Sequence, residues 1–191
     1  MSNFFLKKLQ KANHFYIDRT FIFPPDFSQL IVLLYFDENI KKRYPGCFLL
    51  INNKSETGYS LLFNNLYNIL TIENTKKLNL KSYTTDFEPA LVNSLKKIFK
   101  GIKHIGCYYH FSRNVYEKMK KFNLLNKDLL DNTLHLYKNI LSLPYTFKRD
   151  NTLLDSIFNK YGENYKPFKN YFVRQWKNYQ FRYLKIYLNT I

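Results

Sequence analysis

Residues 14–23, His-Phe-Tyr-Ile-Asp-Arg-Thr-Phe-Ile-Phe, are rich in β-branched and aromatic side chains and stop at Pro24 and Pro25. Because proline cannot continue the interior of a strand, this stretch predicts a first strand that ends at the two prolines. A continuous apolar run over residues 29–36 predicts a second strand buried on both faces, and residues 47–51 predict a third. Three strands with short connections are typical of an antiparallel meander.

Beyond this meander, helical spacing alternates with short strand-like runs. The connection over residues 37–46 is polar and contains a Pro-Gly turn signal. Ser55 or Thr57 is a candidate cap for the first helix, Pro89 suits the first turn of the second, and Gly101 is expected to close it. The predicted elements are a helix over residues 59–70, a strand over 81–87, a helix over 89–100, a strand over 103–109 and a helix over 111–122.

The element order β-β-β-α-β-α-β-α predicts an α/β fold with a mixed sheet, because antiparallel strands are followed by alternating units. It is the order of the ribonuclease H-like fold. After about residue 125 only helical spacing is found, over residues 129–141, 152–161 and 168–187. We therefore expect an N-terminal extension over residues 1–13, an α/β core over residues 14–125 and an all-helical region over residues 126–191.

The charge of the chain favours a polyanionic partner. Lys and Arg number 30 against 14 Asp and Glu in 191 residues, for a net charge of +16, and two segments, residues 89–127 and 164–191, carry most of the excess. Clustered positive charge releases counterions from phosphate, so nucleic acid is the expected partner. A compositional bias toward Lys is the alternative. The candidate DNA-contacting residues are Arg19, Lys96, Lys97, Lys100, Lys103, Arg113, Lys118, Lys120 and Lys121.

Several classes of protein are excluded by the composition. The longest strongly apolar run, residues 30–36, is far shorter than the roughly 20 residues that span a bilayer, so no membrane association is expected. No apolar segment of a secretory signal is found near the N-terminus. Cys47 and Cys107 are the only cysteines, which favours a reducing, intracellular location over a disulfide-stabilised secreted fold.

Two acidic residues occupy predicted strand positions, where Asp is unfavourable unless a cation, a hydrogen-bond network or water accompanies it. Asp18 lies inside the first predicted strand and Asp86 at the end of the fourth, and these strands are neighbours in the expected fold, about 4.8 Å apart. Close carboxylates repel unless they share a cation, and oxygen ligands on a rigid sheet suit Mg²⁺. Two such ions promote phosphoryl transfer. The alternatives are that Asp86 caps the helix beginning at Pro89 and that Asp18 is a solvated strand residue.

Cys107 and His110 form a Cys-x-x-His spacing at the end of the fifth predicted strand. A structural zinc site needs four ligands, and only Cys47 and His104 are further candidates. A Cys107 nucleophile with His110 as its base lacks an accompanying oxyanion-hole signature. A packed cysteine beside a helix-start histidine is the remaining interpretation.

Together these motifs resemble the transposase domain of Mutator-like DNA elements, the MULE group. The run Asp18-Arg-Thr-Phe resembles the Asp-Gly-Thr-Phe motif of that family. The run Thr85-Asp-Phe-Glu resembles its second-acid motif, and Gly106-Cys-Tyr-Tyr-His-Phe resembles its Cys-x-x-His block. The resemblance covers about residues 14–125, and the later helical stretch is similar in kind to the start of the helical insertion of these transposases.

The resemblance implies a DDE-type enzyme that cuts and joins DNA. Asp18 and Asp86 would be its first and second catalytic acids and would hold two Mg²⁺ or Mn²⁺ ions for attack on a phosphodiester. Cys107 and His110 would be a family signature of structural or DNA-positioning role. The implied partner is DNA, both at the ends of the element and at the target site. The implied location is the nucleus if the host is eukaryotic, and the chain could form a homo-oligomer.

The sequence departs from the family pattern in two ways. Arg19 replaces the usual Gly, where it would contact phosphate or disturb the metal site. No segment resembles the Glu motif of the third acid, so we expect a chain truncated before that acid, with little or no activity alone. The alternatives are a non-enzymatic DNA-binding or regulatory protein derived from a transposase and a two-acid nuclease that recruits Glu88 or Glu117.

Overall fold

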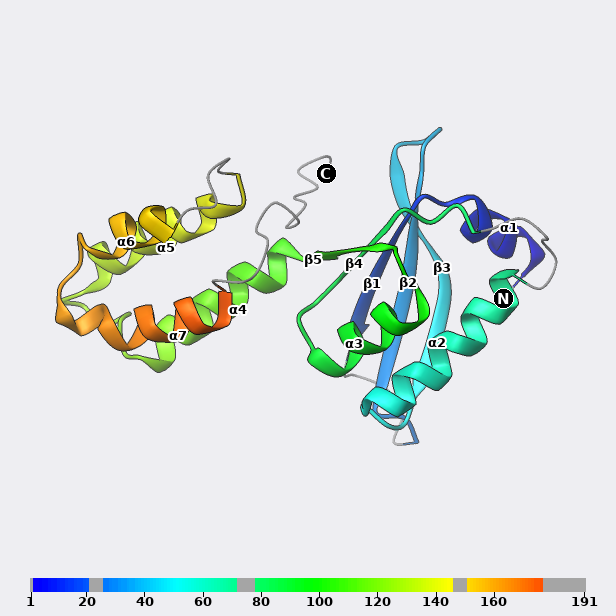
Figure 1. Ribbon diagram of the computed structural model, residues 1–191, viewed down its shortest axis with the longest axis horizontal. Helices are drawn as coiled ribbons and strands as arrows, with labels where there is room; N and C mark the ends of the chain where they lie inside the picture. Colours follow the sequence, from blue (N-terminus) through cyan, green and yellow to red (C-terminus); the bar gives the residue numbers. More distant parts are fainter. Residues whose placement is uncertain (1, 21–25, 72–77, 146–150, 177–191) are drawn as a thin grey trace. The chain divides into compact units, whose positions relative to one another are not determined.

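The computed structural model is divided by its internal contacts into two compact parts (Figure 1). We call Met1–Gly106 the sheet unit and Cys107–Ile191 the helical unit. The division falls directly after the last strand, so the helix predicted over residues 111–122 belongs by its contacts to the helical unit. The structure describes residues 2–20, 26–71, 78–145 and 151–176.

The sheet unit contains one five-stranded mixed sheet with the order β3-β2-β1-β4-β5. Strands β1, β2 and β3 are antiparallel neighbours, whereas β4 runs parallel to both β1 and β5. The predicted mixed α/β sheet and its antiparallel meander are therefore confirmed. The elements are α1 Asn3–Lys11, β1 His14–Thr20, β2 Gln29–Asp37, β3 Lys42–Ile51, α2 Glu56–Thr71, β4 Ser82–Thr85, α3 Pro89–Ile98 and β5 Lys103–Gly106.

The predicted connection between the second and third strands was too long. Strand β3 begins at Lys42, five residues earlier than expected, because residues 42–45 pair with the end of β2 despite their polarity. A register shift at Leu33/Leu34 accommodates Pro45 on this edge strand. Only residues 38–41 form the turn, and Lys41 adopts a left-handed backbone with φ 56°.

Two other predicted strand ends differ from the structure. The strand expected over residues 81–87 is shorter, at Ser82–Thr85, and the strand expected over residues 103–109 ends at Gly106. The chain turns into a helix at Tyr108, so the apolar residues there serve a helix and not a strand. Residues 21–23, the predicted end of the first strand, lie outside the described residues.

Helix α1 was not predicted from the sequence. It places Leu9 in the core, where the side chain is fully buried, and its last turn carries basic residues that suit a helix C-terminus. Lys8 pairs with Asp37 at the end of β2, 2.8 Å away. This N-terminal segment is therefore packed on the sheet.

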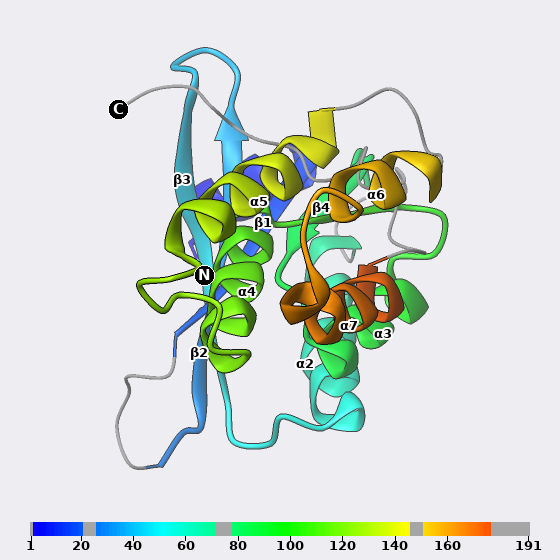
Figure 2. The same ribbon diagram turned by 90° about the vertical axis from the view of Figure 1, so that its left-hand side faces the viewer.

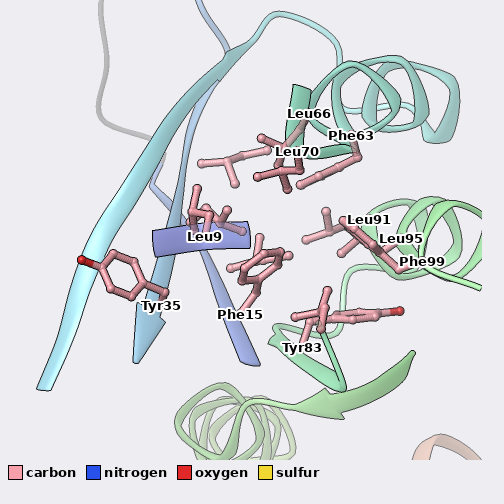
Figure 3. Packing of buried hydrophobic residues seen from close by; sticks show 14 of the residues in the cluster. Leu9, Phe15, Tyr35, Phe63, Leu66, Leu70, Tyr83, Leu91, Leu95 and Phe99 are labelled. Atoms are coloured by element: carbon pink, nitrogen blue, oxygen red, sulfur yellow. The ribbon is translucent and has the colours of Figure 1, made fainter. Parts of the chain in front are cut away.

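Helices α2 and α3 build the core against one face of the sheet. Phe15 of β1 lies at the centre, and Figure 3 shows the apolar side chains of both helices pointing toward it. Ser55 accepts a hydrogen bond from the amide of Gly58 at 3.1 Å, so Ser55 is the cap predicted for α2. The helical layer contributes to this core Phe63, Leu66 and Leu70 of α2, Leu91 and Leu95 of α3, and Phe99, which directly follows α3.

The helical unit has its own aromatic core. Phe111 of α4 packs edge-on against Trp176 of α7 with ring centroids 4.9 Å apart, and Phe122 packs against Phe168. Among the described residues, no helix is both long and apolar enough to cross a bilayer. In the described part of this unit the α-helices are α4 Tyr108–Lys121, α5 Leu130–Ser142, α6 Asn151–Phe158 and α7 Lys166–Trp176 (Figure 2).

Candidate functional site

The pairing of β1 with β4 brings the two predicted acids to the same level of the sheet. Tyr16 stands opposite Thr84 in this parallel pair, and two further residues along each strand lead to Asp18 and Asp86. Neighbouring strands are about 4.8 Å apart. Asp18 therefore lies near the carboxyl end of β1 and Asp86 directly after β4, at the edge where parallel-stranded α/β folds build their sites.

A buried histidine fixes this register. The ring of His14 on β1 bonds the hydroxyl oxygens of two β4 residues, Ser82 at 2.6 Å through Nδ1 and Thr84 at 2.9 Å through Nε2. The ring is buried, so these contacts are shielded from water. They tie the start of β1 to β4 four residues before the first acid.

The two acids have different surroundings. Ile17 lies in the core, so the strand alternation turns Asp18 to the opposite face, where it is exposed. Its Oδ1 accepts a hydrogen bond from the backbone amide of Arg19 at 3.0 Å. Asp86, by contrast, is buried, with 8% of its surface exposed.

Arg19 binds the second acid. Its Nε donates to Oδ2 of Asp86 at 2.6 Å, and its Nη2 pairs with the same oxygen. Its Nη1 pairs with Oε2 of Glu88. Burial disfavours the charge of the guanidinium, but the carboxylates of Asp86 and then Glu88 outweigh burial and raise the pKa of Arg19 above its usual value. A single cation thus holds two carboxylates.

Tyr59 of α2 completes the cluster from the helical layer. Its hydroxyl accepts a hydrogen bond from Nη1 of Arg19 at 3.1 Å. The hydroxyl proton has two acceptors, Oε2 of Glu88 and Oε1 of Gln29, each at 2.7 Å. Burial and the adjacent Glu88 carboxylate raise the pKa of Tyr59 to about 12, so the phenol stays protonated and remains a donor.

Asp86 is not the N-cap residue of α3, but it binds a backbone amide at the entry of this helix. The N-cap position of α3 is Glu88, whose side chain makes no capping bond, and Pro89 begins the helix as expected. Oδ1 of Asp86 accepts the backbone amide of Glu88 at 3.1 Å. The two oxygens of Asp86 therefore have separate tasks, one toward the helix entry and one toward Arg19.

This arrangement does not fit a divalent metal ion. Among residues 2–20, 26–71, 78–145 and 151–176, no three His, Cys, Asp or Glu side chains come together to hold one. Oδ2 of Asp86 and Oε2 of Glu88, which are the oxygen ligands that Mg²⁺ or Mn²⁺ would need, both bind the Arg19 guanidinium. We therefore derive no chemical step through a metal here.

Cys107 and His110 lie together at the start of α4. Cys107 is the N-cap residue and is half-buried, and its carbonyl accepts the amide of Phe111 at 3.0 Å. Burial raises the pKa of the Cys107 thiol, but hydrogen bonds with the side chain and backbone of His110 outweigh it and leave the pKa below its usual value. In the described part of the chain, Cys107 and His110 do not form a cluster of zinc ligands with Cys47 and His104.

The predicted DNA-contacting residues divide between the two units. Lys96, Lys97, Lys100 and Lys103 are exposed at the end of α3 and the start of β5 in the sheet unit. In the helical unit, Arg113, Lys120 and Lys121 are exposed on α4, whereas Lys118 is half-buried, 4.5 Å above the Tyr171 ring. Arg19 has only 10% of its side chain exposed, because it is directed at the acids.

Sequence reasoning did not find two members of the acid cluster. Tyr59 was assigned to the core stripe of α2, and Gln29 to an apolar strand. Both are fully buried polar side chains, so each needs a partner. The available signal was an arginine inside a strand, which predicts buried acceptors nearby but does not say where in the sequence they lie.

The fold and the acid cluster define an α/β domain with acidic residues near the carboxyl ends of two neighbouring parallel strands. Residues 15–114 match the family described as the MULE transposase domain. The match covers more than half of the chain, and the protein belongs to this family. No curated protein matches the chain.

Proposed function

We propose that this chain is a DNA-binding domain of transposase descent, with a ribonuclease H-like core, that cleaves and joins DNA little or not at all by itself. Membership of the MULE transposase family supports the descent and DNA as the partner. The strand order and the position of Asp18 and Asp86 support the ribonuclease H-like assignment and their origin as the first two acids of a DDE-type site.

The pairing of Arg19 with Asp86 and Glu88 is the observation that carries this proposal. Two-metal phosphoryl transfer needs carboxylates that are free to bind cations and place them beside the scissile phosphate. Here Asp86 is bound to an arginine through one oxygen and to a backbone amide through the other. Asp86 and Glu88 therefore serve the structure of the domain.

Positive charge supports the binding function. The exposed lysines of the sheet unit, Lys96, Lys97, Lys100 and Lys103, lie within eight positions of one another at the end of α3 and the start of β5. Lys97 is paired with Glu56, which weakens it as a phosphate contact. In a chain of net charge +16, such a group lowers the free energy of DNA binding through counterion release.

Salt-dependent DNA binding tests the proposal. We expect log Kd for duplex DNA to rise steeply with log salt, and the triple variant Lys96→Gln, Lys100→Gln, Lys103→Gln to reduce the slope by about 0.9 for each phosphate that a lysine no longer neutralises. The matched control neutralises three other exposed lysines of the same unit, Lys7, Lys11 and Lys41. Equal effects of the two triple variants would show that the charge acts without a defined surface.

A cleavage assay separates this proposal from its rival, an active DDE-type enzyme. We expect no cleavage of element-end DNA with Mg²⁺ or Mn²⁺, and unchanged DNA affinity in Asp18→Ala. Divalent-ion-dependent cleavage that disappears in Asp18→Ala would establish the enzyme instead.

A further inference from the structure

We infer that Arg19 is a built-in cation that takes the place of a divalent metal ion at Asp86 and Glu88, and that removing its charge creates a divalent-metal site there. The inference rests on the proposed function for its meaning, since it explains why the inherited acids do not cut DNA. Its test uses no DNA, so the two stand or fall separately.

The geometry of the guanidinium is the first argument. All three side-chain nitrogens of Arg19 take part, because Nε and Nη2 bind Asp86 while Nη1 binds Glu88 and the Tyr59 hydroxyl. A planar fork of donors fits carboxylates closely, and a bound metal ion would have to occupy the same oxygen lone pairs. Arginine and metal ion are therefore mutually exclusive at these oxygens.

Charge and burial are the second argument. The Arg19 and Asp86 side chains are only 10% and 11% exposed, and Glu88 is 24% exposed, so water screens their interaction weakly. Two carboxylates against one guanidinium leave a net negative charge, which would attract a cation. A divalent ion approaching these oxygens nevertheless meets the fixed positive charge of Arg19 at hydrogen-bond distance.

Removal of that charge would leave a set of oxygen ligands. Asp86 and Glu88 are held by the backbone at the entry of α3, and the Tyr59 hydroxyl already contacts Glu88 at 2.7 Å. Asp18 faces the opposite side of β1 and is not one of these ligands, so the carboxylates of the set are Asp86 and Glu88. Carboxylate oxygens on rigid elements, with room left for water ligands, are what Mg²⁺ and Mn²⁺ require.

Mn²⁺ binding to the full chain tests this inference, by titration calorimetry and by the loss of the free-ion paramagnetic resonance signal. We expect Arg19→Ala to bind Mn²⁺ at least about tenfold more tightly than the unmodified protein, because a unit charge beside the ligands is gone. Adding Asp86→Asn and Glu88→Gln to Arg19→Ala should abolish the gain. Arg113→Ala, which removes an exposed arginine from α4, is the matched control and should leave Mn²⁺ affinity unchanged.

The unmodified protein supplies a second test that does not depend on the folding of a variant. The Nε–H resonance of Arg19 should exchange slowly with solvent and should not broaden when Mn²⁺ is added. Asp86→Asn alone should not weaken Mn²⁺ binding. Equal Mn²⁺ affinity in the unmodified protein and Arg19→Ala, or broadening of the Arg19 resonance by Mn²⁺, would overturn the inference.

Discussion

Replacing Arg19 by methionine keeps most of the side-chain volume and removes the cation from the acid cluster. Each contact between Arg19 and a carboxylate is worth about 4 kcal/mol of Coulomb energy at the effective dielectric constant of about 20 that suits partly buried pairs. Desolvation offsets much of this, and breaking a buried pair typically costs about 3–5 kcal/mol because a charge is left uncompensated. Since Glu88 is 24% exposed, we expect the lower end, a loss of about 3 kcal/mol in the free energy of unfolding.

A second variant shows whether the loss comes from charge. In Arg19→Met, Asp86→Asn, Glu88→Gln, no uncompensated carboxylate is left in the cluster, so we expect at least about 2 kcal/mol of the loss to be regained. Urea unfolding followed by circular dichroism measures the free energies, and hydrogen exchange of peptides from β1 and β4 locates the change in the sheet unit. The exposed Arg113→Met should change stability by less than about 0.5 kcal/mol.

Two outcomes would refute this reasoning. A loss below about 1 kcal/mol in Arg19→Met would mean that the pairs are screened as surface ion pairs are. A triple variant no more stable than Arg19→Met would mean that packing of the arginine, and not its charge, supports the site.

Three further predictions concern the sheet unit. Burial, and after it the nearby Lys96, lower the pKa of His104 from 6.5 to about 4, so protonation of His104 opposes folding. The free energy of unfolding should therefore fall by about 3 kcal/mol as the pH is lowered from 6.5 to 4. His104→Gln should remove this fall in thermal melts. Gly58→Ala should cost about 1–3 kcal/mol in urea unfolding, because its Cβ would stand 2.4 Å from the backbone oxygen of Asn53, whereas Gly162→Ala, with open space around it, should not. Phe63 is fully buried, so Phe63→Ala should lower the free energy of unfolding by about 3–5 kcal/mol in the same assay. A loss under about 1 kcal/mol would contradict the assignment of Phe63 to the core.

The sequence was informative wherever a local pattern decides the structure. Strand β2 and helices α2 and α3 were predicted to within a few residues, because their apolar spacing reports the face that is buried. The first half of β3 was missed, because Lys42 and its neighbours become strand only through pairing with a distant segment. Helix α1 was missed because a short amphipathic helix has too little pattern to be distinguished from a polar terminus.

The candidate site was predictable as a location and not as a network. The element order predicts that the strands of Asp18 and Asp86 are neighbours, and β1 and β4 are adjacent in the sheet. The network around Asp86 could not be predicted, because its partner Arg19 lies 67 positions away and Tyr59, which contacts Arg19, enters from a helix. Local sequence patterns carry no information on which side chains meet across such separations.

The His14 bridge between β1 and β4 separates the alignment of the sheet from the acid cluster. A slip of one position between these strands would exchange the directions of Asp18 and Arg19, turning the acid inward and the arginine outward. With two hydroxyl partners on β4, His14 penalises that slip from a point remote from the acids. The alignment of the two strands is therefore held independently of the acid cluster, so substitutions at Arg19, Asp86 or Glu88 should leave the register of the sheet in place.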